Sequence, residues 1–209
     1  MKQLLSLVGL NLFVCALYAV ANVTSYALVF PPEEYSVVWL AGGVGVATVM
    51  IFGRRVLVGV ILGAVLSQSI HYLNISSLTA ALTSLSFVLA LVVGGIVQIE
   101  VAYRLIDRYV GLDNPLIELR DTLLYFLLAG PAGCLAGALA GVLLSAFIGA
   151  IPAENILEYM WVWWQCNSLA VLIILPLMMA LFRKPRNNWK IRFFAIGIPL
   201  LLCFGIFLY

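Results

Sequence analysis

Charge is what this sequence has least of. Only 10% of its 209 residues are charged, whereas 65% are hydrophobic. A soluble domain of this length could not bury so much apolar surface, so a soluble fold is excluded. A basic cluster with interleaved polar residues is also missing, which argues against binding to nucleic acid. The composition therefore indicates an integral membrane protein, whose first partner is the lipid bilayer.

Metal ligands and catalytic groups are scarce as well. His71 is the only histidine, so this chain cannot build a two-histidine site for haem or a metal ion. Cys15, Cys134, Cys166 and Cys203 lie singly within apolar runs and share no metal-ligand spacing. There is no serine–histidine–acid triad and no phosphate-binding loop. We therefore expect a non-catalytic region without a metal ion or a cofactor.

Long apolar runs dominate what is present, and they predict membrane-spanning helices rather than barrel strands. We expect seven spans, at about residues 4–29, 37–52, 56–73, 78–102, 123–148, 159–182 and 193–209. All eleven Lys and Arg residues lie in alternate gaps between these runs, and the other gaps contain none. Because Lys and Arg collect in cytoplasmic loops, the N-terminus is predicted to be cytoplasmic and the C-terminus periplasmic. The predicted fold is a single all-α domain over residues 1–209, an integral membrane bundle of seven helices.

Both ends of the chain carry an expectation of their own. The first thirty residues alternatively fit a cleaved signal peptide, although the apolar run is long for one. The last run reaches Tyr209 with no polar flank behind it. We therefore expect the chain to be truncated, as the N-terminal piece of a longer protein.

Small residues recur at four-residue spacing in two of the runs. Gly133, Gly137 and Gly141 share one helix face, and so do Gly59 and Gly63. In lipid, small residues allow helix backbones to approach one another closely. We interpret these five glycines as helix-packing positions within one compact bundle. A seam between two copies, which would give a homodimer, is the alternative.

Glu100 is the only acid inside a predicted span. It lies near the inner end of the fourth run, one helical turn before Arg104, so we interpret it as a structural ion-pair partner. The fourth helix is expected to continue beyond the membrane interface as far as Tyr109.

Uncharged amides inside the runs are the candidates for a binding site. Gln68, Gln165 and Asn167 all fall in the outer half of the predicted bundle. A polar side chain at that depth faces either another helix or a cavity. Trp164 belongs to a tryptophan-rich stretch, which is otherwise typical of an interfacial aromatic belt. We predict a pocket for a small ligand formed by Gln68, Trp164, Gln165 and Asn167.

Three motifs, in this order, resemble the bacterial MASE-type domains, which are membrane-associated sensors at the N-termini of signalling proteins. The first motif is Trp39–Gly43, and Trp39 joins the candidate ligand-binding residues. The second is the turn at Gly53 followed by the helix at Leu62–Gln68, and the third runs from Trp164 to Leu177. The resemblance covers about residues 31–177.

The chain departs from that family pattern at three positions. Asn167 stands where an acid is usual, Ala170 where glycine is usual and Leu40 where proline is usual. Any role carried over to position 167 is thereby reduced to a neutral hydrogen bond.

The resemblance implies a sensory input domain in the bacterial inner membrane. It would detect a small ligand or a state of the membrane, and it would pass this signal to a histidine kinase or a cyclic-di-GMP enzyme domain of the full-length protein. If the chain forms a homodimer, the resemblance implies that it does so through the full-length receptor.

Two other functions fit the same sequence. The size, the amides and the glycine faces also suit a substrate-binding subunit of a small-molecule transporter. A scaffold that docks another membrane protein through its glycine faces is the third hypothesis. The gene beyond Tyr209 discriminates between the first two, because a transporter subunit would end there and a sensor would continue.

Overall fold

The computed structural model describes residues 2–29, 36–111 and 119–182, and the regular structure in these ranges is helical. The α-helices are α1 (Lys2–Ala27), α2 (Leu40–Phe52), α3 (Leu57–Tyr72), α4 (Leu78–Tyr109), α5 (Leu119–Leu127), α6 (Gly133–Phe147) and α7 (Ile156–Phe182). The 3₁₀ turns η1 (Arg54–Val56) and η3 (Ala153–Asn155) precede α3 and α7. A π-helical turn, η2 (Leu128–Ala132), joins α5 to α6.

Five helical stretches are long and apolar enough to cross a membrane. They are Leu4–Ala27, Arg54–Tyr72, Leu78–Tyr109, Arg120–Phe147 and Ala153–Met179. Each exposes large apolar side chains, among them Leu12, Ile70, Leu82, Leu143 and Leu172. Such a surface is unfavourable in water but natural against lipid tails. The chain is therefore a multi-pass helical membrane protein.

The predicted spans and the observed helices differ in two places. The span predicted at 123–148 is α5, η2 and α6 in succession, and the π turn contains Pro131, which has no N–H to donate. The span predicted at 37–52 is the shorter α2. The span predicted at 193–209 lies outside the described residues, so the count of seven and the periplasmic C-terminus stay predictions.

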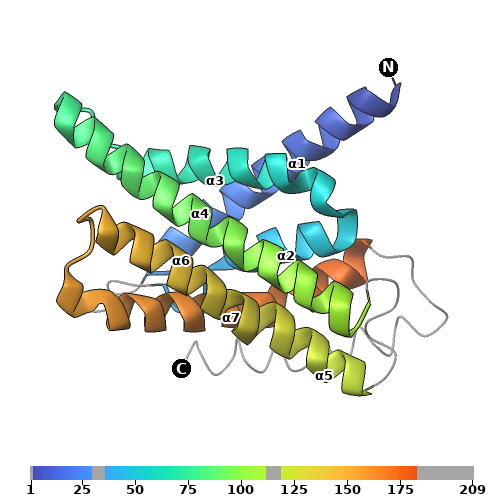
Figure 1. Ribbon diagram of the computed structural model, residues 1–209. Helices are drawn as coiled ribbons and strands as arrows, with labels where there is room; N and C mark the ends of the chain where they lie inside the picture. Colours follow the sequence, from blue (N-terminus) through green and yellow to red (C-terminus); the bar gives the residue numbers. More distant parts are fainter. Residues whose placement is uncertain (1, 30–35, 112–118, 183–209) are drawn as a thin grey trace.

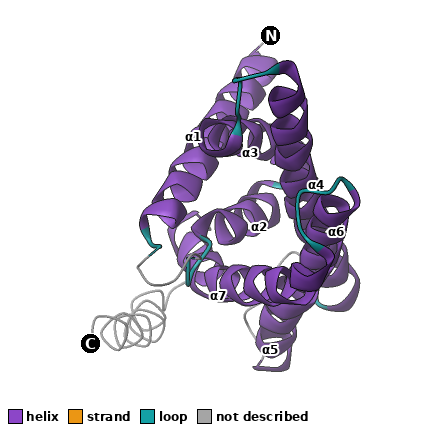
Figure 2. Cartoon of the chain, turned by 90° about the vertical axis from the view of Figure 1, so that its left-hand side faces the viewer, coloured by secondary structure: helices purple, strands orange, loops and turns teal. Residues whose placement is uncertain are grey.

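The short helix α2 is the central helix of the bundle. Its 13 residues extend about 20 Å, well short of the roughly 30 Å hydrocarbon core of a bilayer. Every residue from Ala41 to Met50 is buried, and Figure 2 shows α2 encircled by the longer helices. Because protein surrounds α2, its length does not have to match the thickness of the lipid.

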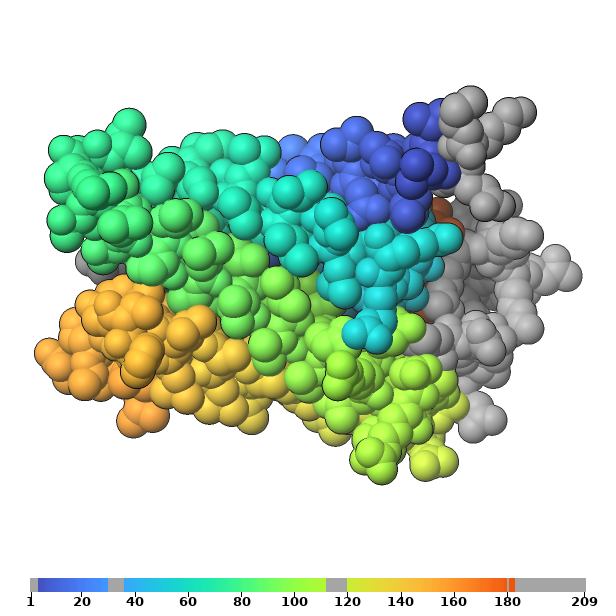
Figure 3. All heavy atoms as spheres, turned by 45° about the horizontal axis from the view of Figure 1, so that its top comes forward, coloured from blue at the N-terminus to red at the C-terminus, as the bar shows by residue number. Residues whose placement is uncertain are grey.

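The outer helices follow one another around α2. Helix α1 packs against α3, α3 against α4, α4 against α6 and α6 against α7, while α2 contacts α1, α4 and α7. Figure 3 shows α4 lying between α3 and the α6–α7 region along the length of the molecule. The bundle therefore consists of an α1–α3 pair and an α4–α6–α7 group, with α2 between them.

Glycines bring α1 and α3 to backbone contact. A Cβ atom on Gly59 would lie 2.4 Å from the carbonyl oxygen of Asn11, and one on Gly63 would lie 2.6 Å from that of Cys15. The side chain of Asn11 adds a polar link, since its Oδ1 accepts a hydrogen bond from the N–H of Gly59 at 2.7 Å. Small residues and one amide thus join these two helices, as packing in lipid requires.

A second set of glycines joins α4 and α6. A Cβ atom on Gly94 would lie 2.7 Å from the Cα of Gly141. Cβ atoms on Gly133 and Gly137 would lie 2.9 and 2.6 Å from side-chain Cβ atoms of α4. The structure therefore places all five glycines of the sequence motif at helix contacts within a single chain.

The basic residues of the described chain gather at one end of the bundle. Figure 1 shows that the N-terminus, the α2–α3 turn, the end of α4 and the start of α5 lie together, opposite the α3–α4 and α6–α7 turns. Here Glu100 accepts a hydrogen bond from Arg104 Nε at 2.8 Å and another from the guanidinium of Arg54. The Arg104 contact was expected from the sequence, and the link to Arg54 ties the end of α2 to α4.

Candidate functional site

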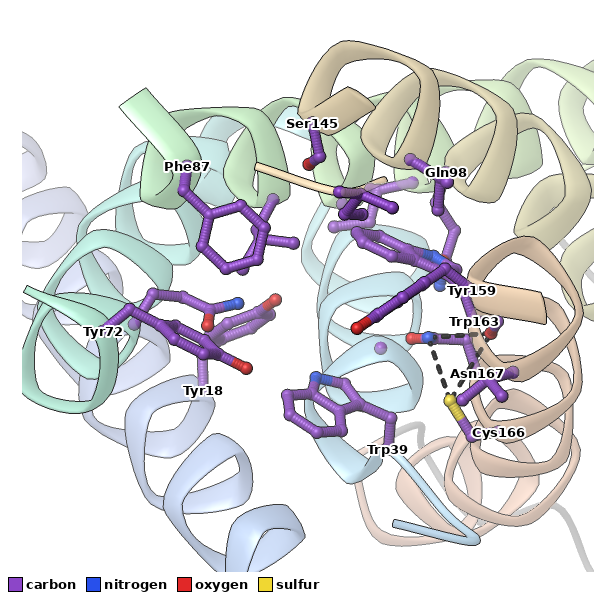
Figure 4. Close-up of a pocket in the computed structure, with 18 residues that line it drawn as sticks. Tyr18, Trp39, Tyr72, Phe87, Gln98, Ser145, Tyr159, Trp163, Cys166 and Asn167 are labelled. Atoms are coloured by element: carbon purple, nitrogen blue, oxygen red, sulfur yellow. Dashed lines mark hydrogen bonds between the residues drawn. The ribbon is translucent and has the colours of Figure 1, made fainter. Parts of the chain in front are cut away.

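A cavity of about 160 Å³ lies between six helices (Figure 4). Its lining is Tyr18, Trp39, Gly42, Gln68, Tyr72, Phe87, Leu91, Gly95, Gln98, Ile99, Val142, Ser145, Ile151, Tyr159, Val162, Trp163, Cys166 and Asn167. None of these residues is charged. An apolar protein cavity of roughly this size holds one benzene-sized molecule. The arrangement therefore suits a small, uncharged occupant.

Aromatic rings form most of the walls of this cavity. In Figure 4, Tyr18, Tyr72 and Phe87 face Trp39 and Trp163 across the cavity. The rings of Tyr72 and Phe87 meet edge to face with centroids 5.1 Å apart, which fixes that wall. Aromatic faces of this kind favour planar partners that can stack or pack edge-on.

Three buried amides line the cavity, and two of them, Gln98 and Asn167, bond to Trp163. The Oε1 of Gln98, on α4, accepts a hydrogen bond from the indole N–H of Trp163 at 3.3 Å. The Nδ2 of Asn167, on α7, donates to the carbonyl oxygen of Trp163 at 3.0 Å and to the sulfur of Cys166 at 3.5 Å. Both amides are therefore held in place through Trp163.

Gly42 makes room for these amides. A Cβ atom at this position would lie 1.9 Å from Asn167 Oδ1 and 3.2 Å from Gln98 Nε2. Any larger residue on α2 would therefore displace the Asn167 side chain. Because glycine has no side chain, the amide ends of Gln98 and Asn167 both lie next to Gly42 on the cavity wall.

The start of α2 is fixed to both sides of the cavity. The N–H of Leu40 donates to the hydroxyl oxygen of Ser25 on α1 at 2.8 Å. The N–H of Trp39 donates to the carbonyl oxygen of Cys166 on α7 at 3.2 Å. These contacts satisfy N–H groups that a helix start otherwise leaves unpaired, and they position the indole of Trp39 on the cavity wall.

A second hollow, of about 360 Å³, adjoins the first and shares Trp39 and Tyr72 with it. Here Tyr26 stacks on His71 with ring centroids 3.7 Å apart. The hydroxyl of Tyr26 donates to Oε1 of Gln68 at 2.7 Å. Because His71 is exposed at the end of α3, this hollow lies between the inner cavity and that end of the bundle.

The structure brings together three of the five residues that the sequence suggested for ligand binding. Trp39, Gln68 and Asn167 line the cavity. Trp164 points elsewhere, and its indole N–H donates to the carbonyl oxygen of Pro131 at 2.9 Å. Gln165 is exposed on the outer surface of α7. These two residues therefore do not contact the cavity.

Sequence reasoning missed Gln98 and Gly42 as cavity residues. Gln98 lies toward the inner end of the predicted span 78–102, so it was not grouped with the amides of the outer half. A usable signal was the spacing of Gly95 and Gln98, which lie three residues apart, share a helix face and both line the cavity. Gly42 falls within the motif Trp39–Gly43, but its contact with Asn167 depends on how α2 packs against α7.

Comparison with known proteins gives one match. A family model described as MASE1 matches residues 9–208. No curated protein and no solved structure matches the chain.

Proposed function

The chain belongs to the MASE1 family of membrane-associated sensor domains, and from this premise we propose that it detects a small uncharged ligand in the cavity described above. A domain of this family is a sensory input module rather than a catalytic one. We further propose that cavity occupancy alters the packing of the bundle and is passed to a signalling domain. Trp39, Gln68, Gln98 and Asn167 are the proposed ligand-contacting residues.

The main support for this proposal is that the residues lining the cavity come from all parts of the bundle. Its residues come from α1, α2, α3, α4, α6 and α7, so they belong to the α1–α3 pair, to α2 and to the α4–α6–α7 group. A ligand that contacts all three parts favours one relative arrangement of them over another. A ligand shifts a conformational equilibrium only when its interaction free energy differs between the two arrangements, and differential contact is one source of that difference.

Helix α2 offers a direct route from the cavity to the basic end. Its start is bonded to α1 through Ser25 and to α7 through the carbonyl of Cys166. Just beyond its end, Arg54 pairs with Glu100 of α4. A movement of this short buried helix at the cavity therefore has to be accommodated at the opposite end of the bundle.

The orientation in the membrane is part of the proposal. The one-sided distribution of Lys and Arg supports a cytoplasmic N-terminus in a bacterial inner membrane, with the cavity in the periplasmic half. In a background without native cysteines, Ser76→Cys should react with a membrane-impermeant thiol reagent in intact spheroplasts. Arg108→Cys should react only after permeabilisation. Both positions are exposed, so the reverse labelling pattern would contradict the orientation.

Uptake of fluorobenzene tests the cavity as a binding site. The 209-residue chain in lipid nanodiscs should show saturable ¹⁹F NMR binding beyond the partitioning into empty nanodiscs. Gly95→Leu should abolish it, because Gly95 lines the cavity and a Cβ there would meet only the Tyr18 hydroxyl, at 3.8 Å. Gly9→Leu is the control, since a Cβ on Gly9 meets nothing within 4 Å. Equal binding by the Gly95→Leu variant would place the fluorobenzene elsewhere.

A further inference from the structure

Trp163 determines which way two of the three buried amides of the cavity, Gln98 and Asn167, point. Its indole N–H can only donate a hydrogen bond, so Gln98 must face it with the amide oxygen. Its backbone carbonyl can only accept, so Asn167 must face it with the amide nitrogen. The chemistry of one residue thus fixes both amide orientations, which geometry alone leaves ambiguous.

The remaining atoms of these amides form a donor next to an acceptor. Gln98 Nε2 and Asn167 Oδ1 lie within 3.2 and 1.9 Å of the position that a Cβ on Gly42 would take. Within the described part of the chain, neither atom has a hydrogen-bond partner. The two side chains are only 2% and 6% exposed. An occupant that displaces water from the cavity without pairing these two atoms leaves them unsatisfied, so an occupant that satisfies both is selected over one that satisfies neither.

We propose that the cavity recognises a neutral planar molecule carrying an N–H and a C=O side by side, as in a lactam or a primary carboxamide. The C=O of the ligand accepts from Gln98 Nε2, and its N–H donates to Asn167 Oδ1. The ring of the ligand lies among the aromatic walls provided by Trp39, Tyr72 and Phe87. The inference rests on the proposed function, since it names the ligand class of the same cavity.

The absence of charged residues from the cavity lining restricts the class of ligand further. No acidic or basic side chain lines the cavity, and transfer of an unpaired ion into such surroundings is strongly unfavourable. Carboxylates, phosphates and ammonium compounds are therefore excluded. The volume of about 160 Å³ limits the inner part of the ligand to roughly one six-membered ring with a small substituent.

A pair of probes that differ only at the N–H tests this assignment. The lactam 2-pyridone carries the N–H beside the C=O, and N-methyl-2-pyridone lacks that donor. Binding of both to the 209-residue chain in nanodiscs is measured by ligand-observed NMR titration. We expect 2-pyridone to bind roughly tenfold more tightly, because the methylated probe leaves the Asn167 oxygen unpaired. This comparison uses the wild-type chain and does not depend on the folding of any variant.

Three amide-removing variants locate the effect. Asn167→Leu keeps the side-chain size and should abolish the preference for 2-pyridone. Gln98→Met removes the donor to the C=O that both probes carry, so it should weaken the binding of both probes and leave the preference in place. Gln165→Leu removes the exposed amide from the same helix and should leave the preference unchanged. Loss of the preference in the Gln165→Leu variant, its survival in the Asn167→Leu variant, or unchanged affinity of both probes for the Gln98→Met variant would overturn the assignment.

Binding of fluorobenzene distinguishes a failure of this inference from a failure of the proposed function. Equal affinity for the two pyridones, together with saturable fluorobenzene binding, would refute recognition by the amides while leaving the cavity as the ligand site. Saturable binding of none of the three probes would refute the ligand cavity itself, and the amide inference with it.

Discussion

Two adjacent glycines of α4 should respond in opposite ways to the same small change. Gly94 and Gly95 both lie in the middle of the helix, so replacement by alanine raises helix propensity equally, by up to about 1 kcal/mol. Their surroundings differ. A Cβ on Gly94 would lie 2.7 Å from the Cα of Gly141 and 2.9 Å from the ring of Trp163, whereas one on Gly95 would meet only a tyrosine hydroxyl, at 3.8 Å.

The difference between the two variants isolates the cost of the close helix contact. Because the propensity gain is common to both, it cancels when their free energies of unfolding are compared. An added methyl group in a well-packed contact costs about 1–3 kcal/mol. In Gly94→Ala the obstructing atoms include backbone, which cannot rotate away. We therefore expect Gly94→Ala to be about 1–3 kcal/mol less stable than Gly95→Ala, which should be at least as stable as the wild type.

Equilibrium unfolding measures this difference. The wild type and both variants, in mixed micelles, are titrated with a denaturing detergent and followed by tryptophan fluorescence. Equal stability of the two alanine variants would refute the close packing of α4 on α6. A stabilised Gly94→Ala variant would refute it more strongly.

Two further substitutions test the contacts that hold α2. Ser25→Ala removes the buried acceptor of the Leu40 N–H and should lower the free energy of unfolding by about 1–3 kcal/mol. The control is Thr24→Ala, one residue earlier on the exposed side, which should change the free energy of unfolding by less than about 0.5 kcal/mol. Equal effects of the two variants would contradict the role of Ser25 at the start of α2. Glu100→Gln breaks the pairs with two arginines that are themselves more than half exposed, so it should cost less than about 1 kcal/mol. That loss should shrink in high salt, and a large, salt-independent loss would show that the pair is more buried than the structure describes.

The sequence was sufficient to predict membrane helices but not which of them is central. Apolar runs appear wherever a helix contacts lipid or other helices, so α2 looked like one more span. What distinguishes α2 is that its residues from Ala41 to Met50 are buried on every side. That property comes from the positions of the other helices, which no local pattern encodes.

Only part of the candidate site was predicted correctly, because helical periodicity was applied to only some of the candidate residues. Successive residues on a helix are about 100° apart, so neighbours such as Trp164, Gln165 and Asn167 cannot all face one cavity. The spacing of four between Trp163 and Asn167 was the informative one, and both line the cavity. The destination of Trp164 depends on the π turn that presents the Pro131 carbonyl, and sequence alone did not reveal that turn.

The central claim is that occupancy of the cavity changes the packing at the opposite end of the bundle. Nitroxide labels at Val58→Cys of α3 and Tyr109→Cys of α4, both exposed, in a background without native cysteines, report the distance between the two parts of the bundle at the basic end. Pulsed electron paramagnetic resonance is recorded in nanodiscs with and without saturating fluorobenzene, and again with Gly95→Leu as a built-in occupant. The account predicts a shift of the distance distribution with fluorobenzene and a shift in the same direction with Gly95→Leu. Unchanged distributions in a chain that binds fluorobenzene would contradict it.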